Sequence, residues 1–591
     1  MSTLESQQKS IQSLYGWYVD HQLIVNRQYQ RKLVWTQEEK QSLIDSILKK
    51  YPVPAILLAT REDGKYEIID GLQRLHAIVS FVENAFPSLD NRYFPVHEFP
   101  TAAAANIPSR SSDENDEDIQ YLDRQSFTRF LDYSMSLSIL RDATTDEVND
   151  VFKRINTYGH RLSDQERRQA GVQDEYSSAV RELACTLRRD ESSDSVLLND
   201  MPAISIDLPR SSHGYEIMAD NVFWVSQGIL RSTDLRDSMD EQCIADIFAC
   251  TVSGDLISRD KASLDKAYTT GDPLNSRILA ALSVRGKEQV IQEIKYCIDQ
   301  LNRVSDHANK ALKKLLFKKP NNNGFPAFYT ALVIAFYEVL IGERKKISDL
   351  QGLASALNGA AESTDTSRGV GPKDKRRINI DKLKGMLSPY TVESNLQEVY
   401  SNPAALDVDS MIQRSSIEMP NFEFKQGALK LYKQREVDED VFRQVIETIC
   451  GMANIGPDDS GHILIGVADK SKDADRIKDL DKVSPKIVAQ RHIVGVAREA
   501  KCLGLTTEQY FAMWRDRIRR SELSEYLKSD VLSGLRFNEY YGLGVIIIRV
   551  PTQKEVSYVG DRMWVRKADE TIDITGNAKE VAGIVGRFAR Q

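Results

Sequence analysis

The pattern of residues 65–82 constrains the fold of this chain more than any other segment. Residues 65–69 follow an Asp63-Gly64 turn and read Lys-Tyr-Glu-Ile-Ile, which predicts a strand. Apolar residues then recur at helical spacing at Leu75, Ile78, Val79 and Val82. A strand followed directly by a helix predicts an α/β unit in this part of the chain.

The junction between the strand and the helix reads Asp70-Gly71-Leu72-Gln73-Arg74. Gly71 allows a sharp turn, and the free N–H groups of the first helical turn attract anions. Arg74 adds a planar, permanently charged group that suits phosphate, and Asp70 adds an acid that can hold a metal ion or a water molecule. This combination predicts a phosphate site, although the same residues alone also fit an ordinary turn with a surface arginine.

Further motifs lie on both sides of the junction. A capping box at Thr36 and Glu39 opens one helix, and a second box at Thr144 and Glu147 opens a helix that ends near Arg154 and Asn156. The remaining motif residues are Asn26, Tyr29, Gln30 and Arg31 before the first of these helices, and Gly159, Leu162, Ser163 and Glu166 after the second.

Taken in this order, the motifs of residues 10–175 resemble the GmrSD-type N-terminal domain family, a relative of the ParB/sulfiredoxin fold. The family's Asp-Gly-Gln-Gln-Arg motif has Leu72 in place of its first glutamine here. The resemblance implies that the domain binds and hydrolyses a nucleoside triphosphate (GTP, ATP or CTP), with Asp70 and Arg74 as catalytic residues. The residues that it implies for nucleotide binding are Gly71, Gln73, Arg74, Arg154 and Asn156.

Tyr29 and Arg31 are candidates for a different contact. An aromatic ring beside an arginine suits base stacking and phosphate binding, so this pair is predicted to face nucleic acid.

Length and composition limit the rest of the chain. The 591 residues predict several domains, which we place at 1–175, 176–405 and 406–591. A net charge of −8 argues against a broadly basic surface, so contact with nucleic acid must be local. The 6 cysteines form no CxxC pair, which disfavours zinc and fits a reducing cytoplasm. The N-terminus shows no signal peptide, and the apolar run 327–337 is too short for a membrane span, so we expect a cytoplasmic protein and a buried helix there.

Strand patterns are scarce between residues 176 and 405, which predicts an all-α domain. The expected fold is therefore an α+β multidomain protein. Its parts would be a ParB/sulfiredoxin-like α/β domain, a helical domain and a C-terminal α/β domain.

The last third of the chain returns to mixed strand and helix patterns. Residues 462–467 predict a strand, residues 440–452 predict a helix before it, and residues 482–540 read as largely helical. The Glu-Phe-Lys strand, the Gly-x-Ile-Leu-Ile-Gly-Val-x-Asp strand and the late Trp564-Val565-Arg566 strand resemble the AlbA-like domain of the Schlafen family. The resemblance covers residues 412–580.

In nuclease members of that family, two glutamates five apart and a later aspartate hold a divalent metal. The resemblance therefore implies that Glu418, Glu423 and Asp469 bind Mg²⁺ or Mn²⁺ and catalyse phosphodiester cleavage. Glu418 and Glu423 have odd spacing, so they converge only if the chain bends at Pro420. The residues predicted to contact nucleic acid in this domain are Lys425, on the same strand face as Glu423, and Arg515 and Arg519, in a basic helical stretch.

These expectations together describe a prokaryotic anti-phage protein of the modification-dependent restriction type. Its N-terminal domain would bind and hydrolyse a nucleotide, and its C-terminal domain would bind and cleave nucleic acid, with DNA favoured over RNA. A homo-oligomer is left open. The alternative is a non-catalytic, nucleotide-gated regulator that binds nucleic acid without cleaving it.

Overall fold

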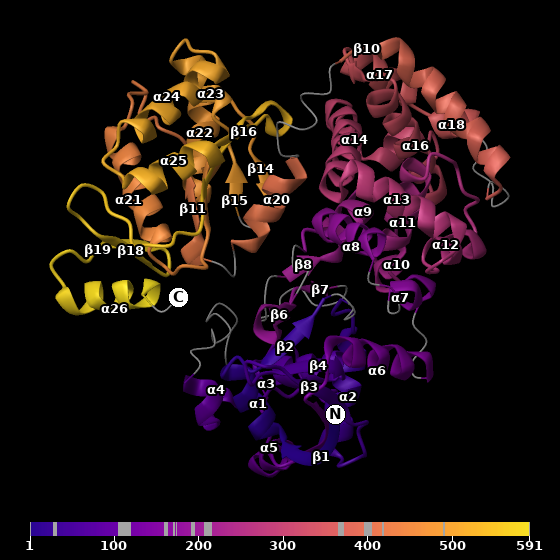
Figure 1. Ribbon diagram of the computed structural model, residues 1–591, viewed down its shortest axis with the longest axis vertical. Helices are drawn as coiled ribbons and strands as arrows, with labels where there is room; N and C mark the ends of the chain where they lie inside the picture. The colour runs from indigo at the N-terminus through magenta and orange to yellow at the C-terminus, as the bar shows by residue number, and fades with distance from the viewer. Residues whose placement is uncertain are drawn as a thin grey trace. The chain divides into compact units, whose positions relative to one another are not determined.

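The structure is a computed structural model that describes residues 2–27, 32–104, 120–158, 163–169, 172, 174–190, 195–205, 216–364, 371–394, 405–415, 419–488 and 491–589. The chain forms two compact units, Met1–Leu396 and Gln397–Gln591 (Figure 1). Both units mix helices with strands, as the sequence predicts.

The first unit begins with a mixed six-stranded sheet. Its strands follow the order β1 (Thr3–Ser10), β5 (Ser134–Arg141), β3 (Ile56–Thr60), β4 (Tyr66–Asp70), β2 (Leu23–Asn26) and β6 (Ser195–Leu197). β3 is parallel to β5 and β2 is parallel to β4, whereas the other neighbours are antiparallel. β6 is part of this sheet but lies beyond residue 175. We placed the end of the first domain at that residue, so the sheet extends past the predicted boundary.

Helices cover both faces of this sheet. The larger core joins one face to α1 (Ile11–Val19), α2 (Gln37–Leu48), α3 (Leu72–Val82) and α5 (Arg124–Leu131). A smaller core joins the other face to α6 (Thr145–Tyr158). Neighbouring residues of β4 alternate between the two, with Ile68 in the larger core and Ile69 in the smaller one. Both predicted capping boxes are confirmed, at the starts of α2 and α6.

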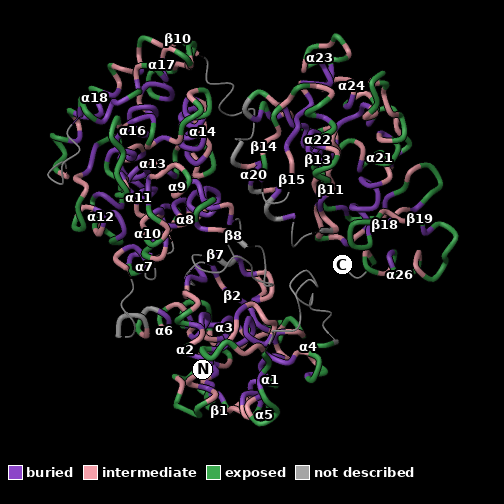
Figure 2. The backbone as a smooth tube through the Cα atoms, turned by 180° about the vertical axis from the view of Figure 1, so that it is seen from behind, coloured by how far each residue is buried: buried purple, intermediate pink, exposed green. Residues whose placement is uncertain are grey.

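Helices dominate the remainder of the first unit. The main ones are α8 (Glu175–Arg188), α11 (Met239–Val252), α13 (Pro273–Arg285), α14 (Lys287–His307), α16 (Pro326–Tyr337), α17 (Leu350–Leu357) and α18 (Lys373–Leu387). Shorter helices are α4 (Pro100–Ala104), α7 (Asp164–Gln169), α9 (Phe223–Ser226), α10 (Ser232–Arg236), α12 (Lys261–Ala267) and α15 (Leu312–Leu316). The predicted buried helix is confirmed as α16, which lies among the buried segments of this region (Figure 2).

The expectation of an all-α region was wrong in detail. β7 (Ala203–Ser205) pairs with β8 (Glu216–Met218), and β9 (Lys345–Ile347) pairs with β10 (Thr391–Glu393). These strands are three residues long, too short to leave a readable alternation in the sequence. Over the described residues, none of the helices combines the length and the apolar character that crossing a membrane requires.

The second unit is built on a four-stranded sheet. Its strands follow the order β11 (Phe422–Lys425), β12 (Gly461–Ile465), β17 (Val545–Val550) and β16 (Arg536–Asn538), with only β11 and β12 parallel. One face packs against α21 (Glu439–Ala453), α24 (Thr507–Arg519) and α25 (Glu525–Gly534), and the other against α20 (Ala405–Arg414).

Smaller ladders and helices surround this sheet. They are β13 (Val467–Ala468), β14 (Lys486–Val488), β15 (Arg491–Ile493), β18 (Trp564–Lys567), β19 (Glu570–Asp573), α22 (Ser471–Asp481), α23 (Ala497–Cys502) and α26 (Ala578–Phe588). The segment 482–540 therefore also contains β14, β15 and β16, and is less helical than we expected.

Candidate functional site

The predicted phosphate site lies where β4 meets α3. β4 ends at Asp70, and α3 begins at Leu72 after Gly71, whose φ of 100° is in the left-handed region. A Cβ at this position would lie 3.0 Å from Cγ1 of Ile56, so glycine is required by both conformation and space. Gly71 has no side chain with which to cap α3, and the N–H groups of the first turn are therefore suited to an anion.

Arg74 is fixed at this junction by three oxygen atoms. Its guanidinium donates to the carboxylate of Asp70 at 2.6 Å and to the backbone carbonyls of Pro54 and Ala55 at 2.6 and 3.1 Å. The side chain of Arg74 is 13% exposed, whereas that of Asp70 is 45% exposed. The pair thus places a rigid cation and an accessible carboxylate beside the start of a helix.

Gln73 contacts the protein backbone, whereas it was predicted to bind the nucleotide. Its amide nitrogen donates to the carbonyl of Lys32 at 2.7 Å, and its amide oxygen accepts from the backbone N–H groups of Val34 and Trp35 at 3.1 and 3.3 Å. The residue is only 8% exposed. Gln73 therefore clamps the 32–35 segment to α3 and does not present its amide to a phosphate.

Among the other residues predicted for this domain, Arg154 has a described side chain. Arg154 is 73% exposed and pairs with Asp150 one turn earlier in α6, at 2.7 Å. Asn156 lies in the same helix, but its side chain is outside the described part of the structure, as are Tyr29 and Arg31 altogether. The roles of these residues remain predictions.

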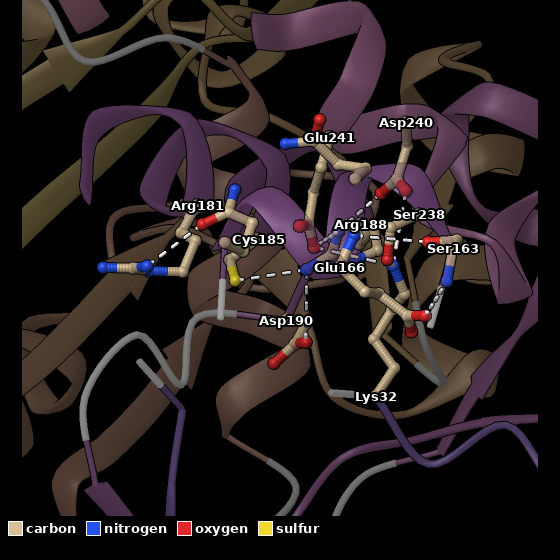
Figure 3. A network of polar contacts seen from close by, with 12 residues as sticks. Lys32, Ser163, Glu166, Arg181, Cys185, Arg188, Asp190, Ser238, Asp240 and Glu241 are labelled. Carbon is tan, nitrogen blue, oxygen red and sulfur yellow. Dashed lines mark hydrogen bonds and ion pairs between the residues drawn. The ribbon is translucent and has the colours of Figure 1, made fainter. Parts of the chain in front are cut away.

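A buried network of charged side chains adjoins the 32–35 segment (Figure 3). Nζ of Lys32 lies 3.3 Å from Asp240 and 3.6 Å from Glu241, and it donates to Oγ of Ser238 at 3.1 Å. Arg188, the last residue of α8, contacts the same two carboxylates at 2.5 and 3.1 Å. The network therefore joins the N-terminal domain to α8 and α11.

The network continues to the other end of the segment 28–31. Arg188 lies 3.9 Å from Asp190, and Asp190 pairs with Arg27 at 2.5 Å. Arg27, Lys32 and Arg188 thus balance Asp190, Asp240 and Glu241, and all of these side chains are at most 12% exposed.

The opposite charges of Asp240 and Arg188 shift each other's pKa values. Burial alone would raise the pKa of Asp240, but Lys32 and Arg188 bring it below its usual value. Burial would likewise lower the pKa of Arg188, yet the carboxylates of Asp240 and Glu241 raise it well above its usual value. The two shifts therefore favour the ionised forms of Asp240 and Arg188, and removing one member of the network leaves buried charges uncompensated.

Ser163 and Glu166, singled out as motif residues, form a helix cap. The N–H of Ser163 donates to the carboxylate of Glu166 at 2.9 Å, and the N–H of Glu166 donates to Oγ of Ser163 at 3.2 Å. This reciprocal pair opens α7, so the motif has a local structural explanation.

In the second unit, Glu423 is held by cations. Its carboxylate lies 3.0 Å from Lys425 on the same strand and 3.0 Å from Arg566 on β18. Arg566 is 2% exposed at its side chain and also donates to the carbonyls of Pro420 and Phe422. The predicted sharing of one strand face by Glu423 and Lys425 is confirmed.

Asp469 belongs to a different cluster. It forms an ion pair with Arg491, whose guanidinium lies 4.8 Å from the ring centroid of Phe424. Phe424 is the neighbour of Glu423 along β11, so the side chains of these two residues point to opposite faces of that strand. Glu418 is outside the described residues.

The described carboxylates of this region do not form a preassembled metal site. Across the part of the chain that the structure describes, no group of three or more His, Cys, Asp or Glu side chains is placed to hold a metal. Glu423 and Asp469 already face Lys425, Arg566 and Arg491. A cation would have to displace these basic groups before either carboxylate could bind it.

A groove of about 920 Å³ lies between α21, α24 and the segment that leads into β18. α24 lines it with Met513, Asp516 and Arg517, Arg520 follows directly after this helix, and Phe442 and Trp564 add aromatic surface. Arg517 pairs with Glu439 at 2.6 Å and lies 5.1 Å from the centroid of Phe442. Arg515 and Arg519, the predicted pair, lie on the exposed side of α24, away from the groove, because helical spacing separates them from Arg517 and Arg520.

Comparison with known proteins adds one match. The family model of the GmrSD restriction endonuclease N-terminal domain matches residues 14–172, which include the Asp70–Arg74 junction. The match runs from α1 to just past α7 and covers less than half of the chain. A search of curated proteins finds no match to the chain.

Proposed function

We propose that this is a restriction-type, anti-phage protein whose N-terminal domain binds and hydrolyses a nucleoside triphosphate at the Asp70–Arg74 junction. The observation that carries the proposal is the match of residues 14–172 to a restriction endonuclease domain, with a fixed Asp70–Arg74 pair at an uncapped helix start inside the matched span. The nucleotide is GTP, ATP or CTP.

Each part of the junction has a chemical task in this proposal. The first-turn N–H groups of α3 bind phosphate oxygens, and Arg74 balances the negative charge that builds up during phosphoryl transfer. The accessible carboxylate of Asp70 orients the attacking water. Gln73 acts indirectly, since it holds the neighbouring 32–35 segment in place.

The second unit is proposed to bind nucleic acid, with DNA favoured over RNA. Two candidate functions differ in the fate of the bound nucleic acid. In the first, an AlbA-like unit cleaves the nucleic acid with Mg²⁺ or Mn²⁺ through Glu418, Glu423 and Asp469. In the second, the protein is a nucleotide-gated regulator that binds without cleaving. The ion pairs of Glu423 with Lys425 and Arg566 favour the regulator, because a metal ion would have to compete with these two basic groups for the carboxylate.

Replacing Glu423 by alanine separates the two functions. If the second unit is a nuclease, the full chain degrades phage DNA, plain DNA or tRNA only with Mg²⁺ or Mn²⁺, and Glu423→Ala lowers the rate by at least about 100-fold. Glu525→Ala is the matched control, because it removes a glutamate of the same unit that is 86% exposed and paired with Lys528. A full chain that binds these nucleic acids but leaves them intact with every metal and nucleotide would establish the regulator.

A further inference from the structure

Arg27 and Lys32 flank the segment 28–31, and both are anchored outside the N-terminal sheet. Arg27 pairs with Asp190, just after α8, and Lys32 pairs with Asp240 in the first turn of α11. Arg188 connects these two anchors through contacts with Asp190 and Asp240. Arg27 and Lys32 are thus both linked by buried ion pairs to residues at the end of α8 and the start of α11.

The segment 32–35 is tied to the proposed nucleotide site from the other side. Gln73 lies one residue before Arg74 in α3 and binds the backbone of Lys32, Val34 and Trp35. A displacement at the start of α3 therefore reaches the backbone of Lys32 through one hydrogen bond of the Gln73 amide, and the backbone of Val34 and Trp35 through two more. The side chain of Lys32 then connects this displacement to α11 through its ion pair with Asp240.

Stability alone does not account for this network. Buried ion pairs contribute little to net stability compared with apolar residues of similar volume, and their best-established use is to fix one arrangement of packed elements. Here the chain keeps three positive and three negative side chains in the interior, at the contact between the N-terminal domain and α8 and α11. Such a contact favours two discrete arrangements over gradual deformation.

We propose that the series Gln73, Lys32, Asp240 and Arg188 transmits the occupancy of the nucleotide site to helices α8 and α11. This inference rests on the proposed function of the Asp70–Arg74 junction and adds its regulation. Gln73 and Lys32 are positioning residues in this account, because their contacts are with the protein. By thermodynamic linkage, a change in the position of α8 and α11 alters the nucleotide affinity by the same coupling free energy.

The test is hydrogen exchange of the full chain with and without nucleotide. GTP, ATP and CTP are each supplied with Mg²⁺ at a concentration that saturates a directly measured binding curve. In the wild-type protein we expect bound nucleotide to slow exchange in α8 and α11 by at least about fivefold. In Lys32→Met/Asp240→Asn, which removes one charge of each sign, nucleotide still binds but this change in α8 and α11 is lost.

Two further variants make the test specific. Gln73→Met removes the hydrogen bonds between α3 and the 32–35 segment and should lose the same exchange response. This variant replaces the double variant in the test if the double variant unfolds. Arg236→Ala is the control, because it breaks an exposed ion pair between α10 and Glu39 of α2, at 2.9 Å, and should keep the response.

The possible failures are distinguishable. A full nucleotide response in α8 and α11 of a folded double variant, or of Gln73→Met, would overturn the link and leave the nucleotide site in place. A wild-type protein that binds none of the nucleotides would overturn the proposed function and the link with it.

Discussion

Replacing Arg74 by alanine should lower nucleotide hydrolysis by the full chain at least about 100-fold, because arginines that stabilise phosphoryl-transfer transition states have effects of this size or larger. Arg74 is held by Asp70 and by the carbonyls of Pro54 and Ala55, so its charge is already in position before a nucleotide binds. A preorganised charge stabilises a developing negative charge more than a mobile one does. Phosphate release with Mg²⁺ and GTP, ATP or CTP measures the effect.

The control for this variant is Lys49→Ala. Lys49 is also the cation of an i,i+4 pair in the N-terminal domain, with Asp45 at 2.7 Å, but it lies at the end of α2. We expect this variant to hydrolyse nucleotide at the wild-type rate. Hydrolysis that is unaffected by Arg74→Ala would show that the site lies elsewhere in the chain.

The second large effect concerns stability. Arg188→Met should reduce the free energy of opening of α8 by about 3–5 kcal/mol, because it leaves Asp240, Glu241 and Asp190 with fewer positive charges than negative ones in a buried site. Methionine keeps much of the volume, so the loss comes from charge and not from a cavity. Native-state hydrogen exchange of α8 in the full chain measures this free energy.

An exposed arginine provides the comparison. Arg377→Met removes a guanidinium that pairs with Glu338 at 2.7 Å, but its side chain is 36% exposed, and such pairs contribute about 0–1 kcal/mol. An equal and small effect of the two substitutions would show that the buried network does not depend on the charge of Arg188.

Local features of this chain could be predicted from sequence. The change from strand to helix around Gly71 and the capping boxes at Thr36 and Thr144 depend on neighbouring residues only, and the structure has them at the predicted positions. The buried helix α16 is explained by a continuous apolar run. Short strands such as β7 and β9 could not be predicted in this way, because three residues are too few to show an alternation of apolar and polar side chains.

The contacts that define the sites depend on distant residues and could not be predicted. Gln73 reads as a phosphate ligand in the sequence, but its partners lie in residues 32–35. Arg188 and Asp240 look like ordinary charged residues at helix ends, and only the packing of α8 against α11 buries them together. Glu423 likewise meets Arg566 across 143 positions of the sequence, which changes its predicted availability for a metal.

Equilibrium binding of nucleotide to the full chain tests most directly whether the Asp70–Arg74 junction is a nucleotide site. GTP, ATP and CTP are titrated separately in the presence of Mg²⁺ into the wild-type protein, Arg74→Ala and Lys49→Ala. We expect at least one nucleotide to bind saturably to the wild-type protein and to Lys49→Ala, and Arg74→Ala to weaken this binding by at least about tenfold through the loss of charge-assisted hydrogen bonds to phosphate. Saturable binding that is equal in all three proteins, or no binding of any nucleotide to the wild-type protein, would contradict this assignment of the site.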